Sequence, residues 1–174
     1  SRGLGDVYKR QVMNMTDGVL TPKQSKEQLI RHTLVDLGLH ETLTYTLTSE
    51  ATVNEFNLFH SLDYTVKLMS PLGEERSAAR KSLIGSLLQT IHYNNAHSNK
   101  DVNIFEIANT YSDKEVSNLA IAVSGDYVNV PWMGKKEAVD FYLVKGFVET
   151  LFKKLCIEES RYTFEKVEAD NKDF

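Results

Sequence analysis

Two short apolar runs decide the fold class of this chain: VNIFEIA at residues 102–108 and LAIAVS at residues 119–124. Apolar runs of this length are typical of strands. A turn-forming stretch, Ser112-Asp113-Lys114, lies between them and predicts that the two strands pair antiparallel. The predicted elements do not alternate as regular βαβ units. We therefore expect an α+β domain with an antiparallel sheet flanked by helices.

Three helices are predicted around this strand pair. The first begins at a capping box that opens with Thr21 and ends near Gly38, which suits a left-handed C-terminal cap. The second spans residues 80–97, although it contains Gly85, which costs about 1 kcal/mol inside a helix. The third spans residues 139–155, where apolar side chains recur at helical spacing.

Shorter elements complete the prediction. Residues 42–47, TLTYTL, alternate and predict a strand with Leu43, Tyr45 and Leu47 on one face. The other expected elements are a short helix at residues 49–56, strands at residues 65–69 and 161–167, and a loop that contains Pro131 and Trp132.

The composition indicates a soluble domain of ordinary size. The chain has 174 residues and a formal net charge of -4, and this mild acidity argues against a module that binds nucleic acid through bulk charge. Its single cysteine, Cys156, excludes an internal disulfide and favours a reducing compartment. No apolar run approaches the roughly 18 residues of a membrane span. We therefore expect a cytoplasmic protein without a membrane segment.

The two ends of the chain differ in character. Residues 1–11, SRGLGDVYKRQ, combine glycines and cations without an apolar period, and we interpret them as a disordered or non-native lead. Residues 12–20 are interpreted as a linker from a preceding domain, and residues 21–174 as the domain itself.

The residues alone do not form a complete catalytic constellation. The sequence has no Gly-rich phosphate loop and no histidine pattern typical of a metal site, and Cys156 is interpreted as a small packed side chain. The charged cluster around Arg76 and Arg80 has two interpretations. It is either an anion clamp near a helix start or, as the residues alone favour, a solvated loop and helix N-terminal turn. Glu106 lies inside an apolar strand, so its carboxylate needs a partner, for which Arg80 is a candidate.

Six stretches, taken in order, carry a resemblance to a known family. They are LTPKQ (20–24), DLGLHE (36–41), YTLT (45–48), SPLGEERSAARKSLIGSLLQTIHYN (70–94), NIFEIANTY (103–111) and WMGKKEAVDFYLVKGFVETLF (132–152). In order and spacing they resemble the synthetase-like core of the bacterial phenylalanine–tRNA ligase beta subunit. No single stretch is a decisive motif, but together they span about residues 20–155.

This resemblance implies a class II aminoacyl-tRNA synthetase-like core, truncated at its C-terminus, that has lost its active site. Active members place a Phe-Arg-x-Glu pattern just after the strand that residues 104–108 resemble. In this chain Tyr111, Ser112 and Lys114 stand at the Phe, Arg and Glu positions. Because a serine hydroxyl cannot replace a guanidinium fork, Ser112 and Lys114 are predicted to mark a lost site. The resemblance therefore implies no catalytic, cofactor-binding or metal-binding residue in this chain.

The resemblance also implies partners. A catalytic alpha subunit, using ATP and Mg2+, would attach phenylalanine to tRNA(Phe) within an α2β2 assembly. This chain would pack on that subunit through the helix at residues 80–97 and the segment before it, with Arg76 and Arg80 as candidate contacts. The sheet is expected to end in an exposed edge. Two alternatives stay open: a self-sufficient class II ligase, against which Ser112 argues, and a stand-alone class II-like binding or regulatory paralogue.

Overall fold

The structure, a computed structural model, describes residues 17–56 and 65–165. The predicted lead at residues 1–11, most of the predicted linker and the end of the strand predicted at 161–167 lie outside the described residues. The elements in chain order are α1 (Pro22–Asp36), β1 (His40–Glu41), β2 (Leu47–Thr48), α2 (Glu50–Glu55), the 3-10 helix η1 (Glu74–Arg76), β3 (Ala78–Ala79), α3 (Ile84–Ala96), β4 (Val102–Tyr111), β5 (Glu115–Ser124), β6 (Asp126–Val130), η2 (Pro131–Met133), β7 (Lys135–Ala138), α4 (Phe141–Lys154) and η3 (Glu159–Arg161).

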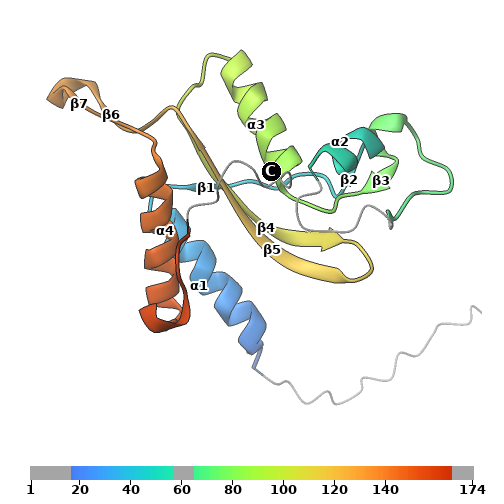
Figure 1. Cartoon of the computed structure of the whole chain (residues 1–174), viewed down its shortest axis with the longest axis horizontal. Coiled ribbons are helices and arrows are strands. Elements are labelled where there is room, and N and C mark those ends of the chain that lie inside the picture. The colour runs from blue at the N-terminus through green and yellow to red at the C-terminus, as the bar shows by residue number, and fades with distance from the viewer. Residues whose placement is uncertain (1–16, 57–64, 166–174) are drawn as a thin grey trace, which may run out of the picture.

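The antiparallel pair predicted from the two apolar runs is confirmed, and it is the centre of the fold (Figure 1). β4 and β5 pair along their whole length, with Phe105 opposite Ile121, and the turn between them lies at residues 112–114. β1 joins the other side of β4 in parallel, so the order is β1-β4-β5. Within the described residues, β5 has no strand on its outer edge.

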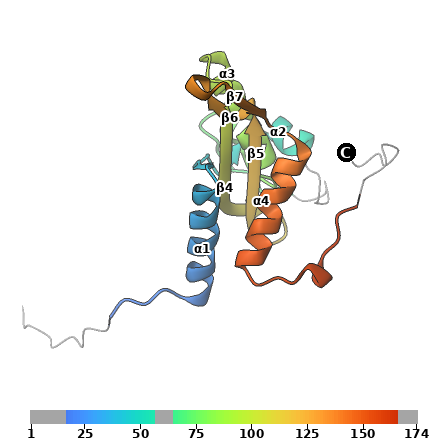
Figure 2. The same cartoon turned by 90° about the vertical axis from the view of Figure 1, so that its left-hand side faces the viewer.

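Helices cover both faces of this sheet (Figures 1 and 2). Alternation along β4 sends Phe105 toward α1 and α4, where Leu34 and Phe147 complete a buried cluster. It sends Ile104 to the opposite face, where Leu87 of α3 covers it. Each face of β4 therefore contributes to its own buried cluster, one on each side of the sheet. None of the helices in the described part of the chain has the length and apolar character needed to cross a bilayer.

The predicted capping box of α1 is confirmed. The backbone N–H of Gln24 donates to the hydroxyl of Thr21 at 3.3 Å, and the N–H of Thr21 donates back to the Gln24 side chain at 2.9 Å. After the helix, Gly38 has a φ of +83°, the left-handed conformation predicted for it. This turn brings Leu39 into the core and starts β1.

The second predicted helix is shorter than expected. α3 begins at Ile84, not Arg80, because residues 78 and 79 form β3, which pairs with β2, and the backbone N–H of Arg80 donates to the carbonyl of Thr46. Gly85 lies in the first turn of α3, where α2 crosses closely. A Cβ there would lie 2.8 Å from Cγ2 of Thr52 and 2.9 Å from Cδ2 of Phe56. Close packing of α2 thus explains a glycine that helix propensity disfavours.

Replacing Gly85 with alanine is therefore expected to destabilise the chain. Overpacking costs about 1–3 kcal/mol, which exceeds the roughly 1 kcal/mol that alanine gains by helix propensity. Gly146 of α4 is the matched control, because a Cβ there meets no heavy atom within 4 Å. Thermal unfolding should show a lower Tm for Gly85→Ala and a higher one for Gly146→Ala. Equal gains for the two variants would contradict the packing argument.

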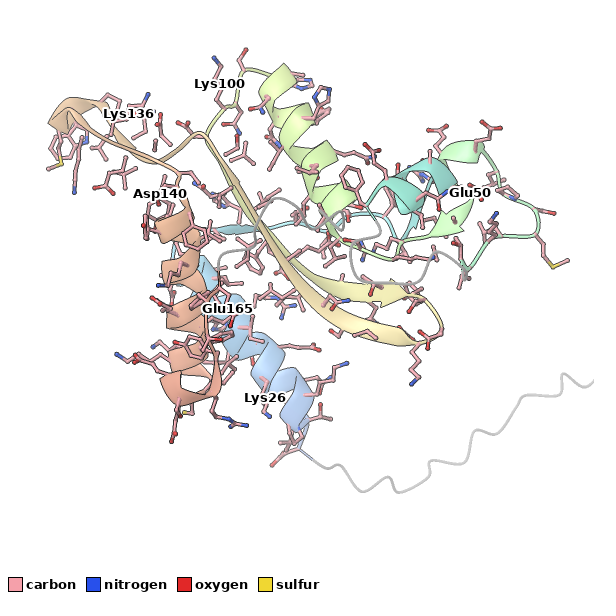
Figure 3. The ribbon with its side chains drawn as sticks, viewed as in Figure 1. Lys26, Glu50, Lys100, Lys136, Asp140 and Glu165 are labelled. Carbon is pink, nitrogen blue, oxygen red and sulfur yellow. The ribbon has the colours of Figure 1, made fainter. Side chains whose placement is uncertain are left out.

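Pro131 and Trp132 lie in a connecting turn, as predicted, but the strands on either side of it, β6 and β7, were not predicted, and they pair as a β-hairpin with η2 as its turn. The hairpin projects from the rest of the fold (Figure 1), with Lys136 on it and Lys100 near its base (Figure 3). Its base is fixed by Asp101, whose carboxylate accepts from the Asn129 side chain and the Asp126 N–H. These two hydrogen bonds lower the pKa of Asp101.

The C-terminal part of the described chain also differs from the prediction. α4 matches the helix predicted at residues 139–155, and Asp140 caps it by accepting from the N–H of Leu143 at 2.7 Å. Residues 161–165, however, form no strand: η3 leads into extended chain whose Tyr162 packs its ring on Phe152. The aromatic side chain of this segment therefore packs on α4, and its backbone does not pair with a strand. The strand predicted at residues 65–69 is reduced to one isolated bridge between Lys67 and Ala78.

Candidate functional site

A buried ion pair joins the central sheet to the segment before α3. Nη1 of Arg80 lies 2.9 Å from Oε1 of Glu106, and these side chains are only 5% and 1% exposed. The partner suggested for Glu106 from its place in an apolar strand is thereby confirmed. Burying two charges costs free energy unless their remaining hydrogen-bonding groups are also satisfied.

Thr44 helps to satisfy these groups. Its hydroxyl accepts from Nη1 of Arg80 at 2.8 Å and donates to Oε2 of Glu106 at 2.7 Å. Its backbone N–H donates to Oε1 of Glu106 at 3.2 Å. Nε of Arg80 donates to the carbonyl oxygen of Asn109 at 3.1 Å. Three segments far apart in sequence therefore meet at one carboxylate.

This network explains why the strand predicted at residues 42–47 is wrong. The chain runs beside β4 through Thr42, whose N–H donates to the carbonyl of Phe105 at 2.9 Å. At Thr44 the Glu106 side chain accepts the backbone N–H, and the chain then crosses to a second sheet, where Leu47 pairs with Ala79. Between the two sheets, Thr44 is partly buried, whereas the apolar side chains predicted to share one face are exposed. Leu43 is 86% exposed and Tyr45 is 68% exposed.

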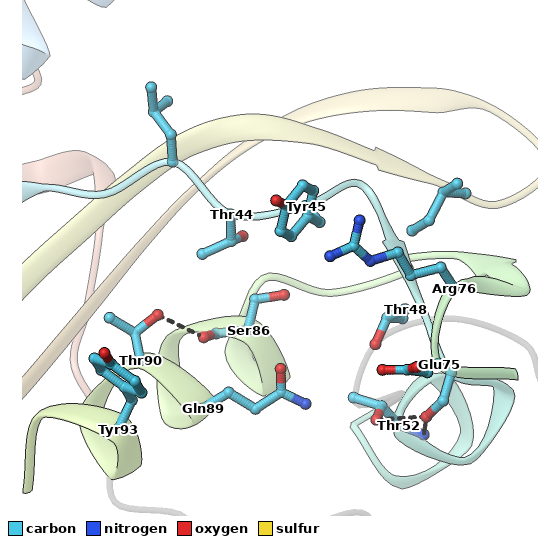
Figure 4. A pocket seen from close by; sticks show the side chains of 13 residues that line it. Thr44, Tyr45, Thr48, Thr52, Glu75, Arg76, Ser86, Gln89, Thr90 and Tyr93 are labelled. Atoms are coloured by element: carbon cyan, nitrogen blue, oxygen red, sulfur yellow. Dashed lines mark hydrogen bonds between the residues drawn. The ribbon is translucent and has the colours of Figure 1, made fainter. Parts of the chain in front are cut away.

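The crossing segment forms one wall of a hollow, hereafter the α3 hollow, with a volume of about 510 Å³ (Figure 4). α3 provides the opposite wall through side chains that include Gln89 and Tyr93. The residues that line the hollow are Leu43, Thr44, Tyr45, Leu47, Thr48, Ser49, Thr52, Glu75, Arg76, Ser86, Gln89, Thr90 and Tyr93.

The two arginines predicted as contact residues have different positions. Arg76 is exposed and borders the α3 hollow, with its guanidinium carbon 3.8 Å from the centroid of the Tyr45 ring. This is a cation–π contact. Arg80 is only 4% exposed, so its side chain offers almost no surface to a partner in this conformation. Arg80 therefore has a structural role inside the chain, and the contact prediction is carried forward for Arg76 alone.

Ser112 and Lys114, the predicted lost-site positions, form the turn between β4 and β5. The N–H of Ser112 donates to the carbonyl of Lys114 at 3.1 Å, and its hydroxyl donates to Oδ1 of Asp113 at 3.0 Å. The Ser112 hydroxyl is thus engaged within the turn. Its short side chain provides neither the positive charge nor the fork of donors that an arginine would supply for a phosphate.

A second hollow, of about 410 Å³, lies between the start of α3 and the sheet. Thr110 and Asn118 line it and bond to each other, the Asn118 amide donating to the Thr110 hydroxyl at 2.6 Å. Leu119, Ala120 and Ile121 of β5 contribute apolar walls. Lys81 and Ser82 also line this hollow, and the lining residues include no carboxylate.

The described residues contain no group of three or more His, Cys, Asp or Glu side chains that could hold a metal ion. The interpretation of Cys156 as a packed side chain is wrong: it is exposed, with a φ of +58°, directly after α4 ends. Sequence reasoning also missed Thr44 and Tyr45, which looked like ordinary members of an alternating strand.

Solved structures of other proteins have a fold similar to that of this chain. The chain is similar to Desulfitobacterium hafniense PylSc, a pyrrolysyl tRNA synthetase, with a TM-score of 0.59 and 16% identity over 79% of this chain and 46% of that one. It is also similar to a histidine–tRNA ligase subunit from Alicyclobacillus acidocaldarius, with a TM-score of 0.55 and 12% identity over 86% of this chain and 43% of that one. These likenesses concern the fold alone, which is that of a class II tRNA synthetase.

The family follows from the sequence. The family described as phenylalanyl tRNA synthetase beta chain CLM domain matches residues 9–174, and this chain belongs to it. The chain is 37% identical over 153 residues to the phenylalanine–tRNA ligase beta subunit of Staphylococcus aureus (strain Mu50). The matched region covers 84% of this chain and 19% of the relative. It is 36% identical over 152 residues to that of Staphylococcus epidermidis, which covers 83% and 19%. The chain thus spans about a fifth of the length of these relatives.

Proposed function

We propose that this chain is a non-catalytic structural core of a phenylalanine–tRNA ligase beta subunit, which supports ATP-dependent attachment of phenylalanine to tRNA(Phe). It does so by packing on the catalytic alpha subunit of a cytoplasmic α2β2 assembly. Membership of the beta-chain family supports this proposal. The observation that carries the non-catalytic part is the turn at residues 111–114, where Tyr-Ser-Asp-Lys stands in place of an arginine-bearing pattern.

The donor set of this chain does not fit the ATP and Mg2+ that the whole enzyme would use. The Ser112 hydroxyl is engaged by Asp113, and the Lys114 side chain is exposed at the tip of the turn. We therefore assign no ATP-binding or Mg2+-binding residue to this chain and place that chemistry on the alpha subunit.

Phenylalanine-dependent ATP–pyrophosphate exchange tests the non-catalytic role. The chain alone should show no exchange above a protein-free blank, and the alpha subunit with the full-length beta subunit should exchange and aminoacylate. Ser112→Ala in the full-length beta subunit should leave the aminoacylation rate within about twofold of wild type, because the residue contacts no reacting group in this proposal. Exchange by the chain alone, or a large loss in Ser112→Ala, would show that the site is active.

Exposed side chains beside the α3 hollow provide the contact surface in this proposal. Leu43, Tyr45 and Tyr93 are all largely exposed, and they border one continuous hollow that includes Arg76. Large apolar side chains gathered on one surface are typical of protein interfaces. The helix predicted to contribute to the interface, now bounded as α3, supplies Tyr93.

Tyr45→Asp in the full-length beta subunit is expected to weaken its association with the alpha subunit by at least tenfold, because it places a charge in an apolar contact. Tyr142→Asp is the matched control, since Tyr142 is 75% exposed on α4, away from the α3 hollow. Titration of labelled alpha subunit gives both affinities. If Tyr142→Asp weakens binding and Tyr45→Asp does not, the proposed surface is wrong. If neither variant changes the affinity, packing through this core is wrong.

A further inference from the structure

The α3 hollow contains a cation whose position is fixed by an aromatic ring. Arg76 lies at the end of η1, and its guanidinium carbon is 3.8 Å from the Tyr45 ring centroid. The contact with the ring uses no N–H group as a conventional hydrogen-bond donor, and a guanidinium carries five such donors in its own plane. Arg76 is thus held by the ring, and none of its side-chain N–H groups donates to another residue in the described part of the chain. Figure 4 shows it beside Tyr45 at one side of the hollow.

No carboxylate of the described residues lies within 4.0 Å of the Arg76 guanidinium. This differs from Arg31 and Arg80, which lie 2.7 Å and 2.9 Å from Glu41 and Glu106. Glu75 also borders the hollow, but within the described residues it forms no ion pair with Arg76. The guanidinium edge is therefore open to an acid from outside the described chain.

The walls of the hollow indicate what kind of acid fits. Leu43, Tyr45 and Tyr93 provide apolar surface for the stem of a side chain. Gln89 reaches in from α3 (Figure 4), and its amide can donate a further hydrogen bond. An aliphatic stem that ends in a carboxylate matches this combination.

Nucleic acid is a poorer match for the same surface. Its phosphates come at close intervals, and a strand bound at Arg76 would bring neighbouring phosphates close to Glu74 and Glu75, which precede Arg76 in η1. A chain with a formal net charge of -4 has no excess of cations to offset this repulsion. A single carboxylate needs only one charge partner.

From these observations we propose that the α3 hollow is a socket for an aspartate or glutamate side chain of the alpha subunit, and that Arg76 binds its carboxylate in the plane of the guanidinium. The inference rests on the function proposed above, because that function supplies the partner. It adds the chemistry of the contact: a charge-assisted, bidentate hydrogen bond at the edge of an aromatic-stacked arginine.

The test measures the affinity of the full-length beta subunit for the alpha subunit at two salt concentrations. Arg76→Glu should weaken association at least tenfold and should flatten its salt dependence. Arg76→Lys should have a smaller but measurable effect, because lysine keeps the charge and loses the fork. Arg161→Glu is the matched control and should stay within twofold of wild type, because Arg161 is exposed in η3 and does not line the hollow.

The outcomes separate the two proposals. If Tyr45→Asp weakens association and Arg76→Glu does not, the interface stands and the socket is wrong. If neither variant has an effect, the packing proposal fails as well. A photo-cross-linking residue in place of Gln89 gives an independent result. A cross-link to an alpha-subunit peptide that contains Asp or Glu supports the socket. A cross-link only to tRNA or to another part of the beta subunit, or none at all, overturns it.

Discussion

Replacing Glu106 with glutamine is expected to lower the free energy of unfolding by about 3–5 kcal/mol, because it leaves a buried arginine without its counter-charge. The side chain is almost the same size, so little of this loss comes from packing. Glu106 also accepts from the backbone N–H and the hydroxyl of Thr44. The variant therefore weakens the crossing between the two sheets as well as the ion pair. Urea unfolding followed by circular dichroism gives the free energy.

The Arg31–Glu41 pair supplies the control for this prediction. It has a similar geometry, with 2.7 Å between Nε and Oε1, but its side chains are 36% and 26% exposed. Glu41→Gln is expected to cost only about 0.2–1 kcal/mol, because water screens an exposed pair. Replacing both buried partners, with Arg80→Met and Glu106→Leu, should recover part of the loss, because neither charge then stays buried alone but Thr44 still loses its acceptor. If Glu106→Gln costs no more than Glu41→Gln, burial does not control the strength of the pair.

Replacing Gly125 with alanine is expected to cost about 2–4 kcal/mol, for two reasons that add. Gly125 has a φ of +81°, which an alanine adopts only with strain. A Cβ there would also lie 2.3 Å from the carbonyl oxygen of Lys100, a backbone atom that cannot swing away. The substitution should therefore disturb the connection between β5 and the β6–β7 hairpin.

Gly134 separates these two contributions. It also has a positive φ, +61°, but a Cβ there meets no heavy atom within 4 Å. Gly134→Ala should cost only the backbone strain, about 1–2 kcal/mol. Urea unfolding of both variants measures the difference, and hydrogen exchange at the Asp126 N–H, which bonds to Asp101, reports whether the hairpin base has opened. Equal losses for the two variants would mean that the close contact with Lys100 relaxes freely.

Local signals in the sequence predicted the local parts of the fold. The capping box at Thr21, the left-handed turn at Gly38 and the strand pair around Phe105 depend on residues near one another in the chain, and all three are confirmed. The strand predicted at residues 42–47 failed because a carboxylate 62 positions away from Thr44 accepts its backbone N–H. No local pattern contains that information.

The candidate site shows the same division. A carboxylate inside an apolar strand gave a clear signal that Glu106 needs a partner, and Arg80 was within the set of candidates. Nothing in the sequence near Arg80 shows that it would be buried. The sequence therefore predicted both Arg76 and Arg80 as surface contacts, although only Arg76 is exposed. The stacking of Arg76 on Tyr45 depends on the crossing segment, whose course was not predicted. The loss of function expected at Ser112 and Lys114 stays a prediction.

The buried network of Thr44, Arg80 and Glu106 has a consequence for how the family can vary. Each of these side chains bonds to the other two, so a lineage that loses one of them retains two that no longer match. Substitution at these three positions should then be tolerated in concert and be rare in isolation. Glu106 lies in the central sheet and Thr44 borders the α3 hollow. A substitution in the core is therefore expected to be accompanied by a substitution at the surface of the hollow.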